Sequence, residues 1–357
     1  MQQQFTSTVN TTNPLLREVS QQIQRFILLP DPSLYEFVSL WAIGTHVYKE
    51  FQHCGILNIE SPTHGCGKST TLEILELLCY NAGSPTVAPT QAGLFHGADD
   101  VTMLLDEVDT WSRELRQSLV SILNAGFSAG GVVMRLAKDD LGNYDKNRKY
   151  PVYCPKVLAG IGEIISGATR NRAFTITLQR QSREEKRERF IRSKKAVFAD
   201  LKKKIAQWAE ANRGRVREVY DKDAFPYLEG FADRTYDVSC GLASILEVMK
   251  EHPSDFLRAL EIVRGETNEA VQEALVFRAL LALSKDGQPI IGMASELSEL
   301  TGISESFVTA TLRKYGFETK NVRQGGAPRK RYFLQPGELT SLMSSYFVVG
   351  GPPERPA

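Results

Sequence analysis

Residues 55–70 read GILNIESPTHGCGKST and place a short apolar run directly before a glycine-rich loop. The run 55–60 is typical of a buried strand, and residues 70–83, TTLEILELLCYNAG, have helical spacing with Gly83 as the expected C-cap. A strand, a glycine-rich loop and a helix in this order turn backbone N–H groups and the positive end of the helix dipole toward an anion. The stretch therefore predicts a phosphate site in an α/β fold.

The loop supplies two side chains suited to nucleotide chemistry. Lys68 is expected to reach the β- and γ-phosphates, and the Ser69 hydroxyl is expected to bind Mg²⁺. The general pattern has glycine at position 62, where this chain has Pro62, so the strict motif is missed by one residue. The alternative is a glycine-rich turn that only caps a helix. The residues expected to bind the nucleotide are Gly65, Cys66, Gly67, Lys68, Ser69 and Thr70.

A second acidic element follows in MLLDEVD, residues 103–109. Its apolar residues predict a buried strand that ends at Asp106, which is expected to hold Mg²⁺. Glu107 is expected to orient and deprotonate the attacking water, so the adjacent pair favours ATP hydrolysis over nucleotide binding alone. Asp109 is a candidate third ligand, although a surface or capping role is preferred. The alternative for the whole element is a strand that ends in solvated acids.

Alternating strands and helices predict an α/β sheet that is covered on both faces. Helical patterns span 15–52 and the residues after Ser112, a candidate N-cap. Strands are expected near 86–88 and at 101–105, 156–162 and 173–179, with a long hairpin at 131–153. The predicted domains are a tail at 1–14, an ATPase domain with a helical entry at 15–182, a helical lid at 183–285, a winged helix at 286–346 and a tail at 347–357.

Length and composition agree with this organisation. At about 150 residues per domain, a chain of 357 residues is expected to form two or three domains. The 43 basic and 42 acidic side chains nearly cancel, so nucleic acid has to be bound by local patches. No apolar run approaches the roughly 20 residues that span a bilayer, and the N-terminus does not resemble a signal peptide. The 5 scattered cysteines form no CxxC pair, which favours a reducing cytoplasm over a zinc or disulfide framework.

The C-terminal segment carries a local basic patch. ASELSELTG and SESFVTATLRKYG predict two helices around a tight turn, with Ser304 as the second N-cap, and FETKNVRQGGAPRKRYFL predicts two short strands. Residues 313–331 hold seven Lys/Arg and one acid. We expect this winged-helix pattern to bind DNA, the alternative being protein docking. The cations expected to face the DNA are Arg313, Arg323, Arg329, Lys330 and Arg331.

Four segments together resemble a known family. SPTHGCGKSTTLEIL, LLDEVDTW, ILNAGF and PKVLAGIGE are similar, in order and spacing, to P-loop ATPases of phage and mobile-element replication modules. That family resembles AAA+ and superfamily-three helicases, and its Pro-Thr before the glycines makes Pro62 usual. The resemblance covers about residues 30–330. It implies ATP and Mg²⁺ as cofactors, an AAA+-like core with a helical lid, and a ring, expected to be a hexamer.

The resemblance also implies roles for three arginines. Related ATPases complete their site with an arginine from a neighbouring subunit, and GATRNRAFTITL offers Arg170 and Arg172 at about this place. Arg172 matches the family position better. The alternative is a pair of solvated or salt-bridged arginines. Arg234 is a candidate sensor of the nucleotide in the same chain.

The hairpin at 131–153 lies where helicases of this type insert a hairpin that tracks DNA in the ring's pore. Its candidate phosphate contacts are Lys138, Lys146, Arg148 and Lys149, and Tyr144 is positioned to stack on a base. The alternative is a solvated surface hairpin. Residues 183–204 hold ten Lys/Arg against four acids, and we interpret them as a solvated helix face.

The combined prediction is a cytoplasmic, Mg²⁺-dependent ATP hydrolase that works as a ring-forming DNA helicase or translocase in replication of a mobile element or phage. Its expected partners are DNA, further copies of the chain and a primase or another replication protein, with no membrane. The rival hypothesis is an ATP-gated switch that recruits a primase, a recombinase or a defence effector without unwinding DNA.

Overall fold

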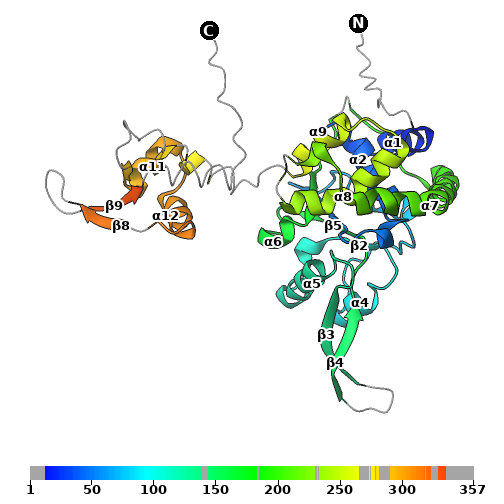
Figure 1. The fold of residues 1–357 in the computed structure, drawn as a ribbon, viewed down its shortest axis with the longest axis horizontal. Helices are drawn as coiled ribbons and strands as arrows, with labels where there is room; N and C mark the ends of the chain where they lie inside the picture. Colours follow the sequence, from blue (N-terminus) through cyan, green and yellow to red (C-terminus); the bar gives the residue numbers. More distant parts are fainter. Residues whose placement is uncertain are drawn as a thin grey trace, which may run out of the picture. The chain divides into compact units, whose positions relative to one another are not determined.

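The computed structural model describes residues 13–138, 144–182, 185–229, 231, 233–264, 273, 275–277, 279–280, 290–317, 319–322 and 329–334. The chain divides into two compact units, residues 1–265 and 266–357 (Figure 1). The first unit is built around a parallel β-sheet, and the second around a helix pair and a small antiparallel sheet.

Four parallel strands form the sheet of the first unit in the order β2-β5-β1-β6. They are β1 (Ile56–Ser61), β2 (Met103–Leu105), β5 (Lys156–Ile161) and β6 (Ala173–Thr177). Every residue of β1 is buried, as expected for a central strand that is covered on both faces. The predictions of strands at 55–60, 101–105, 156–162 and 173–179 are confirmed. The strand expected near 86–88 is wrong, because that stretch makes only an isolated bridge between Thr86 and Leu105.

Helices cover both faces of this sheet. One face shares a core with α1 (Pro14–Phe26), α2 (Ser33–Gly44), α3 (Lys68–Leu78), α7 (Ala196–Lys222), α8 (Asp233–Met249) and α9 (Ser254–Val263). The other face packs mainly against α5 (Arg113–Ala125) and the short α4 (Gln91–His96). The predicted boundary at 182/183 therefore does not separate two cores. The side chains of α7, α8 and α9 are buried against the same core as α1, α2 and the sheet.

Local signals set several of the helix ends. The Ser112 hydroxyl accepts a hydrogen bond from the Leu115 N–H, which confirms Ser112 as an N-cap. The helix after the glycine-rich loop ends at Leu78 with Cys79 as its C-cap, so the prediction of Gly83 is wrong. The single helical pattern over 15–52 is divided into α1, α2 and a 3₁₀ turn at Tyr48–Glu50. Pro30 and Pro32 lie at the break, where proline disfavours a continuous helix.

The predicted hairpin is confirmed as β3 (Val132–Lys138) and β4 (Tyr144–Pro151), which pair in antiparallel fashion. Figure 1 shows the two strands projecting from the first unit, with α4 and α5 beside their base. Shorter elements complete the unit: α6 (Gly167–Arg170) and the 3₁₀ turns Val108–Thr110, Arg192–Lys194 and Pro226–Leu228. Residues 185–191 contain neither helix nor strand, although the sequence pattern favoured a helix there.

The second unit contains the predicted helices and strands. They are α11 (Ala294–Thr301), α12 (Glu305–Lys314), β8 (Thr319–Val322) and β9 (Arg329–Leu334), with an additional strand β7 (Ile290–Gly292) in the order β7-β9-β8. Ser304 caps α12, because its hydroxyl accepts from the Phe307 N–H. Gly302 ends α11 with φ +71°, a conformation that favours glycine. In the described part of the chain, no helix combines the length and the apolar character that crossing a bilayer requires.

Candidate functional site

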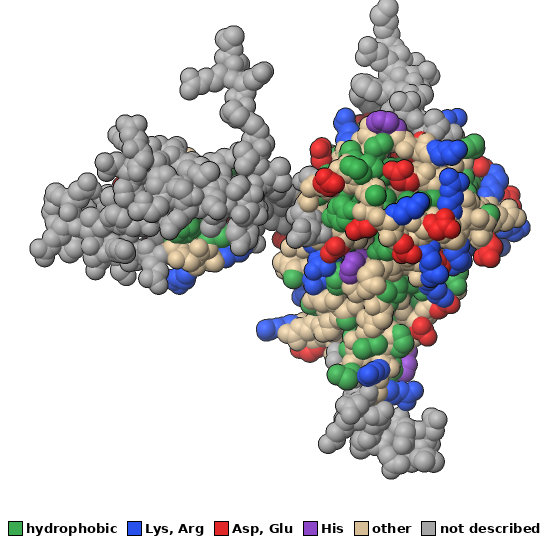
Figure 2. Space-filling model, viewed as in Figure 1, with side chains coloured by type: hydrophobic (Ala, Val, Ile, Leu, Met, Phe, Trp, Pro, Cys, Tyr) green, Lys and Arg blue, Asp and Glu red, His purple; other side chains and the backbone are tan. Residues whose placement is uncertain are grey.

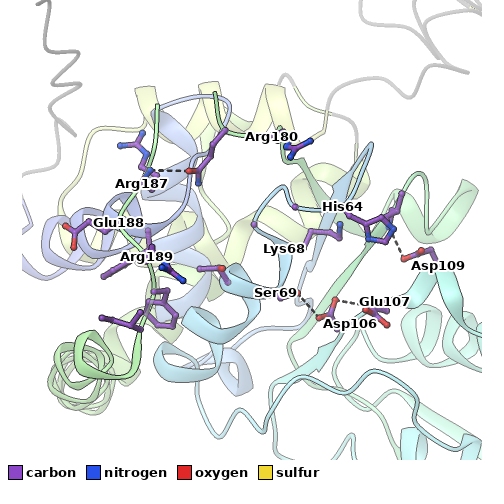
Figure 3. A pocket seen from close by; sticks show the side chains of 18 of the residues that line it. His64, Lys68, Ser69, Asp106, Glu107, Asp109, Arg180, Arg187, Glu188 and Arg189 are labelled. Atoms are coloured by element: carbon purple, nitrogen blue, oxygen red, sulfur yellow. Dashed lines mark hydrogen bonds between the residues drawn. The ribbon is translucent and has the colours of Figure 1, made fainter. Parts of the chain in front are cut away.

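A cleft of about 610 Å³ opens at the carboxyl edge of the parallel sheet, the edge where open α/β sheets bind ligands. Three segments meet there: the loop after β1, the residues after β2, and the chain that follows β6 (Figure 3). The residues that line the cleft are Phe26, His64, Gly65, Gly67, Lys68, Ser69, Thr70, Asp106, Glu107, Asp109, Thr110, Ile161, Arg180, Gln181, Arg187, Glu188, Arg189, Phe190 and Ile191.

The loop between β1 and α3 has a backbone shape that requires glycine. Gly65 and Gly67 have φ values of +77° and +96°, and a Cβ atom would meet nothing within 4 Å at either position. It is therefore the backbone conformation, and not crowding, that requires glycine here. Gly67 is the N-cap of α3 and provides no side chain to cap it. The first N–H groups of α3 thus remain available to an anion.

Three predicted ligands lie close together in the cleft. Lys68 Nζ donates to Ser61 Oγ at 2.6 Å, which holds the ammonium group at the end of β1. Ser69 Oγ lies 3.4 Å from Asp106 Oδ2, so a hydroxyl from the loop and a carboxylate from the end of β2 face each other. Thr70, Gly65 and Gly67 also line the cleft, whereas the Cys66 side chain is buried and donates to the carbonyl of Thr63.

Glu107 follows directly and has an unusual backbone. Its φ of 51° and ψ of 36° place it in the left-handed region, which costs a non-glycine residue about 1–3 kcal/mol. The Glu107 N–H donates to Asp106 Oδ1 at 2.8 Å, and the Glu107 side chain is exposed in the cleft. Asp109 has a structural task instead, because its Oδ1 accepts from the Ile161 N–H at 2.9 Å. Asp109 therefore ties the turn after β2 to the end of β5, which is neither the surface role nor the capping role preferred for it.

The chemistry of these oxygens suits a magnesium ion. Mg²⁺ prefers hydroxyl, carboxylate and water ligands and is usually bound through one or two carboxylates plus substrate phosphates. Ser69 and Asp106 offer one hydroxyl and one carboxylate at the mouth of the loop. Among the described residues, no group of three or more His, Cys, Asp and Glu side chains forms a metal site. An ion bound here would therefore need phosphate and water oxygens to complete its shell.

Arg170 does not reach the cleft within its own chain. Its Nη1 lies 3.2 and 3.3 Å from the two carboxylate oxygens of Glu60, and Glu163 lies 3.8 Å away. Glu60 is buried in β1 and also accepts from Asn58 and from the Ile164 N–H. The alternative of a salt-bridged arginine describes Arg170 in this structure.

Arg172 and Arg234 lie together near the amino end of the sheet. Their guanidinium carbons lie 4.7 and 5.1 Å from the centroid of the same ring, that of Phe127. Arg172 donates to Asn124 Oδ1 at 3.1 Å and to the Ala168 carbonyl, and Arg234 pairs with Asp237 at 3.1 Å. Burial, and secondarily the charge of Arg234, lowers the pKa of Arg172. Neither arginine lines the cleft, so this geometry gives no support to Arg234 as a sensor in the same chain.

The hairpin presents cations in its described part. Arg148 and Lys149 are exposed on β4, and the Arg148 guanidinium carbon lies 5.8 Å from the centroid of the Tyr150 ring. Figure 2 shows Lys and Arg side chains over this end of the first unit. Lys138 ends β3, Tyr144 begins β4 and Lys146 lies within β4, but their side chains are outside the described residues.

The predicted DNA contacts of the second unit are described only in part. Arg313 is exposed on α12, whereas its neighbour Lys314 pairs with Glu273 at 2.8 Å. The backbone of β9 includes Arg329, Lys330 and Arg331, whose side chains lie outside the described residues, as does Arg323 entirely. The DNA role of these residues stays a prediction.

Sequence reasoning missed one wall of the cleft. Arg180, Gln181 and residues 187–191 line it opposite the acidic residues, and Phe26 contributes from the end of α1. A signal for Arg180 was present. It follows β6 closely, and β6 pairs with β1 in parallel register, so both chains leave the sheet at the same edge. Residues 187–191 gave no comparable signal, because their charges resembled a solvated helix.

No protein-family model matches this chain, and no curated protein matches it. Solved structures show distant similarity. The A form apo structure of the NrS-1 C-terminal region is 13% identical, with 90% of this chain and 75% of that chain covered and a TM-score of 0.45. Cch of SCCmec type IV, described as an active helicase, is 14% identical, with 85% and 68% covered and a TM-score of 0.41. Drosophila ORC bound to DNA is 12% identical, with 98% and 96% covered and a TM-score of 0.23.

Proposed function

We propose that this protein is a Mg²⁺-dependent ATP hydrolase and that the loop at 65–70 is a P-loop. One observation carries the proposal: a glycine-shaped loop at a helix N-terminus brings Lys68 and Ser69 into one cleft with Asp106 and Glu107. The loop and the start of α3 supply N–H groups for phosphate oxygens, and Lys68 supplies a cation for the β- and γ-phosphates. Bound Mg²⁺ would neutralise charge that develops on these phosphates.

The chain's own residues divide the remaining work. Ser69 and Asp106 would hold the ion, since their oxygens already lie 3.4 Å apart. Glu107 would accept a proton from the attacking water, because its carboxylate is exposed in the cleft while its backbone is fastened to Asp106 at 2.8 Å. The strained backbone of Glu107 supports this role, since such strain is retained mainly where function requires a fixed geometry.

Two variants test the hydrolase. Lys68→Ala should abolish turnover and weaken ATP binding, because it removes the lysine that the loop directs at the phosphates. Glu107→Gln should keep ATP binding and lower turnover at least 100-fold, since an amide holds water but does not accept its proton. The measurements are steady-state ATPase rate and ATP affinity by calorimetry. Lys203→Ala and Glu261→Gln, at exposed positions outside the cleft, are matched controls that should behave as wild type. Wild-type turnover in Glu107→Gln would assign the base to another acid.

We further propose that ATP turnover drives movement on DNA by a ring of copies. The exposed cations of the projecting hairpin suit phosphate contacts, and the helix pair and strands of the second unit suit a winged helix. The loop lies at the carboxyl edge of β1, whereas Arg172 adjoins its amino end, where the Ile56 N–H donates to the Arg172 carbonyl. An arginine at that end completes a nucleotide site only if the site belongs to a neighbouring copy.

One set of ATPase rates distinguishes a motor from a switch. ATPase is measured with no nucleic acid, with single-stranded DNA and with duplex DNA. Stimulation of several-fold by DNA is expected from a motor, because translocation couples hydrolysis to the strand. A rate that ignores DNA would favour the ATP-gated switch that recruits a partner protein.

A further inference from the structure

The cleft extends well beyond the loop that would hold phosphates. Figure 3 shows Lys68 and Ser69 in the middle, with Asp106, Glu107 and Asp109 on one side and Arg187, Glu188 and Arg189 on the other. A volume of about 610 Å³ falls in the range of about 300–1,000 Å³ that is usual for pockets of whole small ligands. The acidic side is where we propose that Mg²⁺ and the attacking water bind. The opposite side takes no part in that proposal.

That side is formed by residues Arg187–Ile191, here called the strap. The strap contains neither helix nor strand, and it is fastened at several points. The Glu188 carboxylate accepts from Arg25 Nε and Nη2 at 3.0 and 3.1 Å and from Lys194 Nζ at 2.5 Å, and the Glu188 N–H donates to the Arg25 carbonyl. The strap is thus tied to the end of α1.

Aromatic packing also holds the strap against α1 and α7. The Phe190 ring packs edge-on against Phe26 and Phe198, with centroids 5.0 and 5.6 Å apart. Beyond the next turn, Arg192–Lys194, the Lys195 side chain pairs with Glu73 of α3 at 2.7 Å, so the chain that follows the strap is tied to the helix that begins at the phosphate loop. A wall held in this way keeps its distance from the loop, which is what a ligand that bridges the two requires.

The strap offers the cleft two apolar side chains, Phe190 and Ile191, beside the charged Arg187, Glu188 and Arg189. Ile191 is 47% exposed although it is a large aliphatic residue, and it lines the cleft beside the partly exposed Phe190. Arg187 also lines the cleft, and its Nε is buried without a hydrogen-bond partner. The same guanidinium donates from Nη2 to the Tyr35 hydroxyl at 3.4 Å, so Nε is the nitrogen of Arg187 that lacks a protein acceptor, and buried polar atoms are almost always paired in folded proteins.

We propose that the strap is the nucleoside wall of the cleft: the base of a nucleoside triphosphate packs against Phe190 and Ile191, and Arg187 donates to an acceptor atom of the nucleoside. This inference rests on the proposed ATP hydrolase and adds the residues that would distinguish a nucleotide from a bare polyphosphate. An aromatic base has a flat apolar face that suits Ile191 and Phe190, whereas a polyphosphate has none.

Two ligands separate the strap from the phosphate loop. Calorimetry with MgATP and with magnesium tripolyphosphate is carried out on wild type, Ile191→Ser and Arg187→Ala. Wild type should bind MgATP at least tenfold more tightly than tripolyphosphate. Each variant should lose about tenfold in MgATP affinity, while its tripolyphosphate affinity stays within twofold. Ile262→Ser, an exposed isoleucine of α9 outside the cleft, is the matched control and should change neither affinity. Thermal unfolding of each variant confirms that it is folded.

The two proposals fail in different ways. Equal affinity of wild type for both ligands, or MgATP affinity in both variants within twofold of wild type, would overturn the nucleoside wall and leave the hydrolase standing. An equal loss of affinity for MgATP and for tripolyphosphate in the variants would also overturn the nucleoside wall, because the strap would then contact phosphate. If wild type bound neither ligand, the proposed hydrolase would fail and the strap would lose its ligand with it. Lys68→Ala should differ from the strap variants, because it should lower the affinity for both MgATP and magnesium tripolyphosphate.

Discussion

Glu36 lies in the first unit, in an environment that disfavours its charge. It lies on α2, a helix whose residues are all buried, and its Oε1 has no hydrogen-bond partner. Burial, followed by the charges of Asp255 and Glu251, raises its pKa from the usual 4.5 to about 8. The folded protein therefore keeps a proton on Glu36 at a pH where the unfolded chain has released it.

A pH dependence of stability follows from this shift. Because the folded pKa is raised, stability is fully present below about pH 4.5 and falls as the pH rises toward about 8. Glu36→Gln stays neutral throughout, so it should be more stable than wild type at pH 8 by up to about 4 kcal/mol and equal to it near pH 4.5. Urea unfolding at both pH values measures the difference, with Glu261→Gln as the exposed control. Parallel pH profiles for wild type and Glu36→Gln would show that Glu36 is not the group responsible.

At the scale of elements, the hairpin is anchored to the sheet by a buried lysine. Lys156 opens β5 and is 1% exposed. Its Nζ donates to the carbonyls of Gly126, Val152 and Cys154 at 2.9, 2.7 and 2.8 Å. These carbonyls belong to the end of α5 and to the chain between β4 and β5. The root of the hairpin is therefore fixed to the sheet that ends at the cleft.

Substitutions in the hairpin test whether it contacts DNA, as a motor requires, or is only a solvated surface element. In Lys146→Ala/Arg148→Ala/Lys149→Ala, ATP binding and basal turnover should persist, because the described side chains of Arg148 and Lys149 do not line the cleft and the loop, Asp106 and Glu107 are unchanged. If the cations grip DNA phosphates, DNA-stimulated ATPase and strand separation should be lost together. The control is Lys203→Ala/Arg215→Ala/Lys222→Ala, which removes the same charge from the exposed face of α7. If the hairpin variant unwound DNA at the wild-type rate, the hairpin would be a solvated surface element.

At the scale of the whole molecule, the arrangement of Arg172 predicts that copies cooperate. Its Nε is buried without a hydrogen-bond partner, and its guanidinium shares the Phe127 ring with Arg234. Two neighbouring guanidinium groups repel each other, and an anion from outside the chain would relieve that repulsion. The γ-phosphate bound by a neighbouring copy is the anion that the proposed ring would bring there.

Mixing experiments test this arrangement. Arg172→Ala should lower turnover about 10³-fold or more if the arginine stabilises the transition state. Mixed with Lys68→Ala under conditions that allow subunits to exchange, it should regain part of the wild-type rate. Some interfaces in such a ring combine an intact loop from one copy with an intact arginine from the next. No recovery on mixing would place the effect of Arg172 within its own chain.

Local physical chemistry determined what could be predicted from the sequence. The strand–loop–helix at 56–78 follows from an apolar run, from glycines required at positive φ and from helical spacing, all of which act over a few residues. The caps Ser112 and Ser304, the hairpin strands and the acidic pair after β2 are of the same kind. Parallel strands then bring Lys68, Ser69, Asp106 and Glu107 to one edge, because the carboxyl ends of neighbouring parallel strands coincide.

Only the tertiary structure decided which distant segments meet. The charges of residues 185–191 resemble a solvated helix, yet the half-buried Phe190 ring packs against Phe26 and Phe198, and this packing places the strap beside the cleft. The helices α7, α8 and α9 share one core with the sheet for the same reason: burial of their apolar faces depends on surfaces supplied elsewhere in the chain. Arg170 likewise forms an ion pair with the buried carboxylate of Glu60, and no local sequence pattern predicts this partner. Such pairings depend on the free energy of the whole packed core, to which local propensity contributes only a small part.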